Sequence, residues 1–215
     1  MRFLIFAIIQ FLLGPVSLVG YLILSARTLW VTKWKHRSSV TALSPLFSRW
    51  LFGTLGFRDD VACEKLFRNA PFVSPVGLWL FVLPLRLGRT LSGFVPAFAR
   101  YPIETPKGKW EAMGLRTAFV DRVVKGEVTR VSQVEILGAG FDTRSYGLPD
   151  GVRAFEVDTA NTQPLKRRAL ERASVDTAGV TFVTVDFNQE NWWDRLIEAG
   201  VDESLPTLFV WEGVT

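Results

Sequence analysis

The stretch VEILGAGFDTR, residues 134 to 144, decides the fold of this chain. A short apolar strand runs into Gly138, Ala139 and Gly140, and an acidic residue, Asp158, follows about 20 positions later. Because glycine has no Cβ, the backbone can turn sharply after the strand and come close to a ligand. A carboxylate at the end of the next strand can accept hydrogen bonds from ribose hydroxyls. The pattern predicts a nucleotide or nucleoside site in an α/β sheet, and so an enzyme.

Residues around the glycines narrow the choice of ligand. Thr143 stands where the dinucleotide fingerprint G-x-G-x-x-G has its third glycine, and Asp142 lies where a pyrophosphate would approach a helix N-terminus. Glu156 and Asp158 are the carboxylates that can hold an adenosine ribose. A cofactor without phosphates fits better, and S-adenosylmethionine is one whose positive sulfonium suits a nearby carboxylate. The alternative is that Gly-Ala-Gly is only a tight strand-to-helix turn.

Three segments carry a family resemblance: VEILGAGFDTRSYGL, FEVDTANTQPLKRRAL and the terminal FVWEGVT. They resemble the motifs of the leucine carboxyl methyltransferase family and its polyketide-associated relatives. The resemblance covers about residues 110 to 215, and the combination is more specific than any one motif. It implies a class I S-adenosylmethionine-dependent O-methyltransferase. The first hundred residues show no resemblance of this kind.

The resemblance also implies roles for Arg116 and Glu212. Arg116 corresponds to an arginine that pairs with the carboxylate of the cofactor's methionine part, which a planar guanidinium can hold bidentately. Its alternative role is that of a solvated surface arginine. Glu212 corresponds to a glutamate after the fourth strand, near the methionine moiety.

Asp186 and Phe187 follow a predicted strand and complete the candidate site. The carboxylate can accept the adenine amino group while the ring covers the base; a helix N-cap region is the alternative. The predicted cofactor-binding set is therefore Arg116, Gly138, Ala139, Gly140, Asp142, Glu156, Asp158, Asp186, Phe187 and Glu212.

Strands and helices alternate from about residue 105 onward. We predict strands over 133–137, 153–157, 180–185 and 207–211. We predict helices over 105–126, with Thr105 as its cap, over 161–173 and over 188–199, and a short helix after Gly140. This order predicts a parallel, Rossmann-like α/β sheet whose ligand lies outside the carboxyl ends of the strands. Lys166, Arg167 and Arg168 are expected on a solvated helix face.

Charge divides the chain into two parts. Residues 1–100 contain 12 Lys and Arg but only three acidic residues, a net of +9, whereas residues 101–215 have a net of −5. A basic region rich in Phe and Trp suits nucleic acid or an anionic membrane surface. A long apolar run in the same region favours the membrane, and we expect no nucleic-acid partner.

That run is FLIFAIIQFLLGPVSLVGYLIL, residues 3–24, which contains no charge. At about 1.5 Å per residue it can cross a hydrocarbon core of roughly 30 Å. Arg27, Lys33, Lys35 and Arg37 follow it, so the positive-inside rule places the rest of the chain in the cytoplasm. We predict a single-pass membrane anchor; a cleaved signal peptide and a buried core helix are the alternatives.

A second apolar stretch, residues 71–85, is shorter and contains three prolines. We expect it to pack on the domain or lie in the membrane interface, with a re-entrant segment or a hydrophobic lid as alternatives. The predicted organisation is thus an anchor over 1–26, a basic apolar region over 27–104 and the N-terminal part of a methyltransferase domain over 105–215. That domain is expected to be truncated, because the family's sheet has seven strands and residue 215 follows the fourth.

The sequence favours a membrane-anchored S-adenosylmethionine-dependent O-methyltransferase with a small-molecule or C-terminal carboxylate acceptor. An NAD(P)-dependent oxidoreductase and a non-catalytic membrane-associated binding module are the alternatives. Methyl transfer depends mainly on holding the acceptor oxygen in line with the methyl group, so no catalytic residue is assigned. With Cys63 as the single cysteine and His36 as the single histidine, we expect neither a metal nor an intrachain disulfide.

Overall fold

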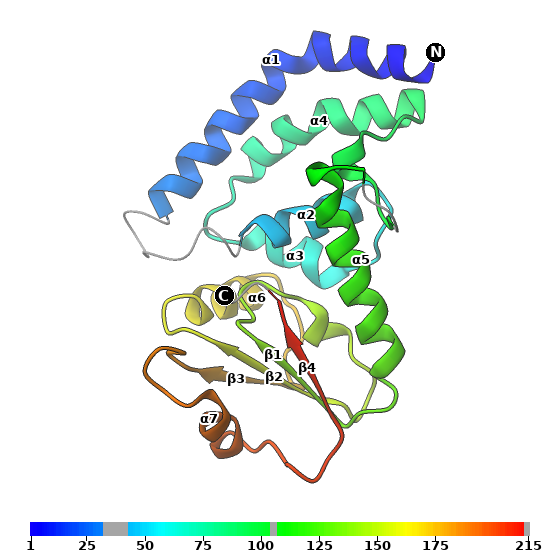
Figure 1. Cartoon of the computed structure of the whole chain (residues 1–215). Coiled ribbons are helices and arrows are strands. Elements are labelled where there is room, and N and C mark those ends of the chain that lie inside the picture. The colour runs from blue at the N-terminus through cyan, green and yellow to red at the C-terminus, as the bar shows by residue number, and fades with distance from the viewer. Residues whose placement is uncertain (32–42, 104–106, 213–215) are drawn as a thin grey trace.

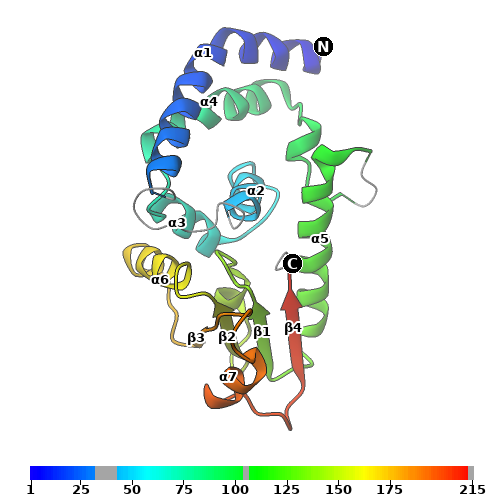
Figure 2. The same cartoon turned by 60° about the vertical axis from the view of Figure 1, so that its left-hand side comes forward.

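The computed structural model describes residues 1–31, 43–103 and 107–212, and its elements form a helical layer on an α/β layer (Figure 1). The helical layer contains α1 (Arg2–Leu29), α2 (Leu43–Thr54), α3 (Val61–Asn69) and α4 (Pro75–Ser92). A 3₁₀ turn, η3 (Ala97–Ala99), leads toward α5 (Lys109–Glu127), which runs from the helical layer down beside the sheet (Figure 2). Helix α5 begins at Lys109 with Gly108 as its N-cap, so the prediction that the helix starts at residue 105 with Thr105 as its cap is wrong; Thr105 itself lies outside the described residues.

Four parallel strands form the sheet in the order β3-β2-β1-β4. They are β1 (Gln133–Leu137), β2 (Arg153–Asp158), β3 (Val180–Thr184) and β4 (Thr207–Trp211). The connections are η4 (Arg144–Gly147), α6 (Gln163–Arg172) and α7 (Trp192–Glu198). The strand predictions are confirmed to within one residue at each end, whereas α7 begins at Trp192 rather than at 188 because Asn191 caps it through Trp193 N.

Different helices pack on the two faces of the sheet. Leu137, Val157 and Val183 point to one face, where they pack with Leu196 of α7. Val134, Ile136 and Val210 point to the other face, where they meet α5 through Val124 and Val128. Strands β1 and β2 are thereby buried on both sides, whereas β4 exposes Phe209 and Trp211 on one of its sides.

The carboxyl ends of the strands face the helical layer. Both views show the strand arrows pointing toward α2 and α3, with α6 beside them (Figures 1 and 2). One apolar core joins the layers, since Phe141 after β1 and Leu165 of α6 pack in the same cluster as Leu46 and Leu66 of the helical layer. The edge where an α/β sheet binds its ligand is therefore covered by helices.

Helices α1 and α4 pack against each other over most of their length (Figure 1), and Pro15 lies inside α1. Glycines permit this close approach: a Cβ on Gly20 would lie 2.3 Å from Phe81 N, and one on Gly77 would lie 2.8 Å from Ile23 Cγ2. Polar side chains of α1 are satisfied there too, because Gln10 Nε2 donates to Pro84 O at 2.7 Å. The helices therefore form a pair.

The stretch over 71–85 becomes most of α4 rather than a segment interrupted by its prolines. Pro75 occupies the first turn, where its missing N–H costs nothing, and Ser74 caps the helix through Gly77 N. Pro84 lies within a helix that continues to Ser92. Leu78 and Val82 are buried in the core, so the expectation of packing on the domain is confirmed.

Candidate cofactor site at the carboxyl edge of the sheet

The glycine turn after β1 is built on the end of β2. Gly138 and Gly140 have φ of 64° and 47°, in the left-handed region that side chains with a Cβ rarely adopt. Ala139 N donates to Val157 O at 2.9 Å, and Gly140 N donates to the carboxylate of Asp158. Asp158 also accepts a hydrogen bond from Thr159 N at 2.6 Å. The predicted ribose carboxylate and the predicted glycine turn are thus held together.

Strand register places acidic residues on both sides of Gly138. Leu137 is paired with Val157 of β2 and with Trp211 of β4, so the next residues along, Asp158 and Glu212, flank the glycine. Such convergence at the carboxyl ends of neighbouring strands is where open α/β sheets bind ligands.

Arg116 of α5 reaches this edge as well. Its Nε lies 2.7 Å from Glu212 Oε1, and the side chains are 39% and 15% exposed. The structure therefore brings together the two residues that were assigned to the methionine part of the cofactor, as an ion pair that solvent still reaches.

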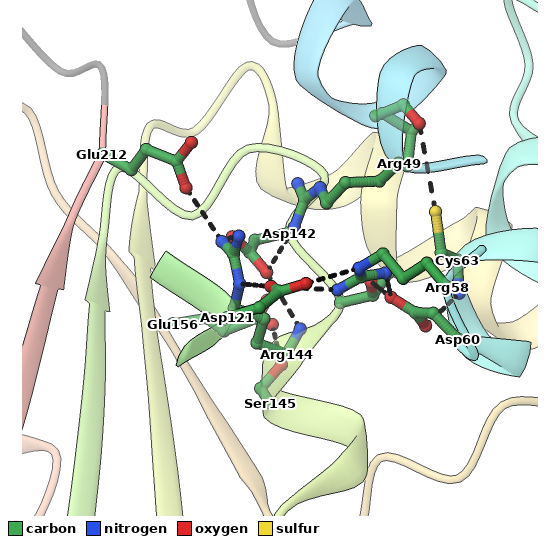
Figure 3. Close-up of polar contacts among 12 residues, drawn as sticks. Arg49, Arg58, Asp60, Cys63, Asp121, Asp142, Arg144, Ser145, Glu156 and Glu212 are labelled. Atoms are coloured by element: carbon green, nitrogen blue, oxygen red, sulfur yellow. Dashed lines mark hydrogen bonds and ion pairs between the residues drawn. The ribbon is translucent and has the colours of Figure 1, made fainter. Parts of the chain in front are cut away.

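The second half of the glycine motif faces the helical layer. Asp142 Oδ1 lies 2.8 Å from Arg49 Nη1 of α2, and Thr143 Oγ1 donates to Asp60 Oδ2 at 2.7 Å. Arg144 Nε donates to Asp121 Oδ1 of α5 at 2.8 Å. Figure 3 shows Arg49 extending from α2 toward Asp142. The motif thus divides into Gly-Ala-Gly at the sheet edge and Asp-Thr-Arg between the layers.

These contacts form one arginine–carboxylate network of four cations and four anions: Arg49, Arg58, Arg116, Arg144, Asp60, Asp121, Asp142 and Glu212. Burial opposes ionisation of Asp142, but the charges of Arg49 and Arg144 outweigh it and hold the pKa of this carboxyl below its ordinary value. The pKa of Asp121 is likewise lowered, since Arg58 and Arg144 outweigh its burial. Asp142 and Asp121 are therefore ionised at neutral pH.

Glu156 lies in the interior, where it meets a lysine. Its Oε2 is 2.6 Å from Lys166 Nζ, both side chains are 1% exposed, and Ser145 Oγ donates to Oε1. Burial raises the pKa of Glu156 although Lys166 opposes the shift. The prediction that Lys166 lies on a solvated helix face is wrong, because the lysine points from α6 into the sheet and neutralises this carboxylate.

The predicted site residues therefore fall into two groups. Arg116, Gly138 to Gly140, Asp158 and Glu212 meet at the carboxyl edge. Asp142 and Glu156 are enclosed by cationic partners, which gives each a structural role, and their direct contact with a cofactor stays a prediction.

Asp186 and Phe187 lie after β3 in a turn of their own. Asp186 Oδ1 accepts from Asn188 N at 3.0 Å, and Asp186 N donates to Glu190 Oε2 at 2.8 Å. Phe187 packs on the cluster around Val183. Since Asn191 is the N-cap of α7, the helix-cap alternative for Asp186 does not apply.

A sequence model of the leucine carboxyl methyltransferase family matches residues 68–215. The chain belongs to the leucine carboxyl methyltransferase family. The match begins well before residue 110, so the view that the first hundred residues carry no family resemblance is corrected: the end of α3 and all of α4 belong to the matched part.

Curated relatives agree with this assignment. A protein from Streptomyces avermitilis is 38% identical over 105 residues, 46% of this chain and 36% of its own length. A protein from Frankia alni is 38% identical over 120 residues, which are 52% of this chain and 41% of that protein. A protein from Mycobacterium marinum is 32% identical over 149 residues, which are 67% of this chain and 47% of that protein. All three are provisionally named S-adenosyl-L-methionine-dependent methyltransferases. The chain spans less than half of the length of these relatives.

Sequence reasoning missed five of the eight network residues: Arg49, Arg58, Asp60, Asp121 and Arg144. Arg49 is the one charged residue in the apolar sequence of α2, LSPLFSRWLFGT, and a charge in such a helix needs a buried partner. That signal pointed to a partner for Arg49 but not to Asp142. Within the described ranges, no group of three His, Cys, Asp or Glu side chains could hold a metal ion.

Proposed function

We propose that this chain forms the cofactor-binding part of an S-adenosylmethionine-dependent O-methyltransferase that acts on a carboxylate or hydroxyl. The observation that carries the proposal is the meeting of the glycine turn, Asp158 and the Arg116–Glu212 pair at one edge of the sheet. Family membership and the names of the relatives support the same activity.

The residues at this edge fit the proposed cofactor. Asp158 is the carboxylate for the ribose hydroxyls, and Gly138 and Gly140 leave room for the nucleoside beside the backbone. The methionine part of the cofactor carries a carboxylate and an ammonium. The guanidinium of Arg116 suits the carboxylate, and the carboxylate of Glu212 suits the ammonium. When bound, the cofactor supplies an activated methyl group. The role of the chain is to position this cofactor and to exclude water from it.

Calorimetry with S-adenosylhomocysteine tests the assignment. We expect binding by the wild-type chain and its loss in Asp158→Ala and Gly138→Val, whereas the matched variants Asp150→Ala and Gly126→Val keep it. Asp150 is exposed, and Gly126 has open space around its Cβ direction. Unchanged binding in both site variants would exclude this site, and tighter binding of NAD would favour the oxidoreductase alternative.

A labelled methyl group separates an enzyme from a binding module. The protein should transfer label from S-adenosylmethionine into a cell extract, and the Asp158→Ala variant should not. Binding of the cofactor without any transfer would favour the non-catalytic alternative. Extraction of the labelled product into organic solvent or its retention on protein then distinguishes a small molecule from a C-terminal carboxylate.

We further propose that α1 attaches the protein to a membrane through residues 3–24. Helix α1 is long and apolar enough to cross a bilayer, and only 11% of its most apolar window is buried. Its polar groups turn inward, since Gln10 and Ser17 donate to carbonyls of α4 at 2.7 and 2.9 Å. A helix that satisfies its polar groups on a neighbour and exposes apolar side chains suits lipid.

Carbonate extraction and protease protection test the attachment. A single span with its domain in the cytoplasm predicts that the protein stays in the membrane pellet and that protease added to inverted vesicles digests the domain. Release by carbonate would refute the anchor. A mature N-terminus after residue 24 would favour the cleaved signal peptide.

A further inference from the structure

A pocket of about 470 Å³ lies between α2, α3 and α4, apart from the carboxyl edge of the sheet. Its volume is within the range of roughly 300–1,000 Å³ that is usual for small-molecule sites. Its lining includes Trp50 of α2, Arg68 of α3 and Leu78, Val82, Leu83 and Arg86 of α4. No lining residue belongs to the arginine–carboxylate network or to the predicted cofactor set.

The walls of the pocket are mainly apolar and come from one side of α4. Leu78 and Val82 form its buried part, while Trp79 and Leu87 are exposed at its edge. The opposite side of α4 is occupied by α1, which packs at Gly77 and Gly88. Because these contacts hold α4 in place from behind, the pocket is preformed and suits an apolar chain.

The charged residues of the pocket are both arginines. Arg86 makes no ion pair with any residue of the described part of the chain, and Arg68 pairs with the exposed Glu64 at 2.7 Å. No acidic side chain lines the pocket. Its electrostatic potential therefore favours an anionic group, and guanidinium groups bind carboxylates well.

We propose that this pocket binds a single-chain amphiphile that ends in a carboxylate, as a fatty acid does. The alkyl chain lies along Leu78, Val82 and Leu83 of α4, and the carboxylate oxygens accept hydrogen bonds from the guanidinium of Arg86 at the edge of the pocket. The proposal is independent of the cofactor site, and methyl transfer is not needed to test it.

A diazirine-labelled fatty acid tests the site on the full chain in a neutral detergent. After irradiation, mass spectrometry should find label on peptides from α2 and α4, and excess dodecanoate should compete it away whereas dodecanol should not. Label confined to α1 would mean partition onto an apolar surface and would overturn the proposal. Equal competition by dodecanol would overturn the role of the carboxylate.

Two variants add a quantitative test by calorimetry with dodecanoate. We expect about tenfold weaker binding in Arg86→Gln and near-complete loss in Leu83→Trp, which fills the pocket. Arg130→Gln, a change of the same type at an exposed arginine on the other layer, should bind as the wild type does. Circular dichroism checks that each variant is folded. Wild-type affinity in both folded pocket variants would contradict the proposal.

Discussion

The guanidinium of Arg116 and the carboxylate of Glu212 lie 2.7 Å apart, although they come from a helix before the first strand and from the end of the fourth. Glu212 uses its second oxygen for Arg144 Nη1, at 2.8 Å. The position of Arg116 is thus linked through one carboxylate to the last residue of the glycine motif. A ligand that displaces Glu212 from Arg116 also changes the environment of Arg144.

Arg116→Gln should weaken the binding of S-adenosylhomocysteine about tenfold or more, because the charge that faces the ligand's carboxylate is lost. Calorimetry on the purified chain measures this. Arg130→Gln is a matched control, since Arg130 is 74% exposed and, in the part of the chain that the structure describes, pairs only with neighbouring Glu127. Equal loss of affinity in the two variants would mean that net charge, rather than the site, is responsible.

Lys166→Met should destabilise the protein by about 3–5 kcal/mol, because it leaves Glu156 buried without its cation. The double variant Glu156→Gln, Lys166→Met should recover much of this loss, since no uncompensated charge remains. Urea unfolding followed by circular dichroism measures both free energies. If the single variant unfolds like the wild type, the ion pair is not formed in solution.

Arg49→Met should loosen the helical layer from the sheet, because Asp142 would lose one of its two cations. We expect a loss of roughly 3 kcal/mol in the free energy of unfolding and faster amide exchange in α2. Arg195→Met removes an arginine from exposed ion pairs and should cost less than about 1 kcal/mol. Similar exchange rates in the two variants would show that Arg49 does not join the layers.

Glu135 should make the protein less stable as the pH rises. Both of its carboxylate oxygens are buried without a partner in the described part of the chain, and burial raises its pKa to about 7 from 4.5. Between these values the folded chain keeps a proton that the unfolded chain releases, so the free energy of unfolding falls with rising pH. Glu135→Gln should therefore stabilise the protein more at pH 8 than at pH 4 in thermal unfolding. An equal effect at both pH values would contradict the raised pKa.

Gly20→Ala should separate α1 from α4, because the added Cβ has no room beside the backbone of Phe81. Limited proteolysis should then cut near α1 at least several times faster than in the wild type. Gly14→Ala is the matched control in the same helix, since a Cβ there meets nothing within 4 Å. Equal protease sensitivity of the two variants would argue against the observed helix pair.

The sheet could be predicted from local signals. Short apolar strands, glycine after β1 and an acidic residue after β2 are all encoded within a few residues, and the positions of β1, β2, β3 and β4 followed from them. Those signals also brought Asp158 and Glu212 to the same edge, because parallel strands end on the same side.

Long-range partners could not be predicted in the same way. From the sequence alone, Asp142 is predicted to be a residue of the ligand site. In the structure it pairs with Arg49 of α2, which lies 93 positions earlier in the chain. Lys166 lies between Leu165 and Arg167, and only the packing of α6 on the sheet decides which of the two charged side chains is buried. The local sequence determines neither the partner of Asp142 nor the burial of Lys166, since both depend on how the layers pack.

The arginine–carboxylate network bears on how this protein can be divided for experiments. A chain that began at residue 105 would match the predicted domain boundary and keep every strand, yet it would lack Arg49 and Arg58. Asp142 and Asp121 would each keep Arg144 as their shared counterion, so two carboxylates would compete for one cation. A start near residue 105 is therefore a poor choice for a shortened protein. The helices before this position belong to the same folding unit as the sheet.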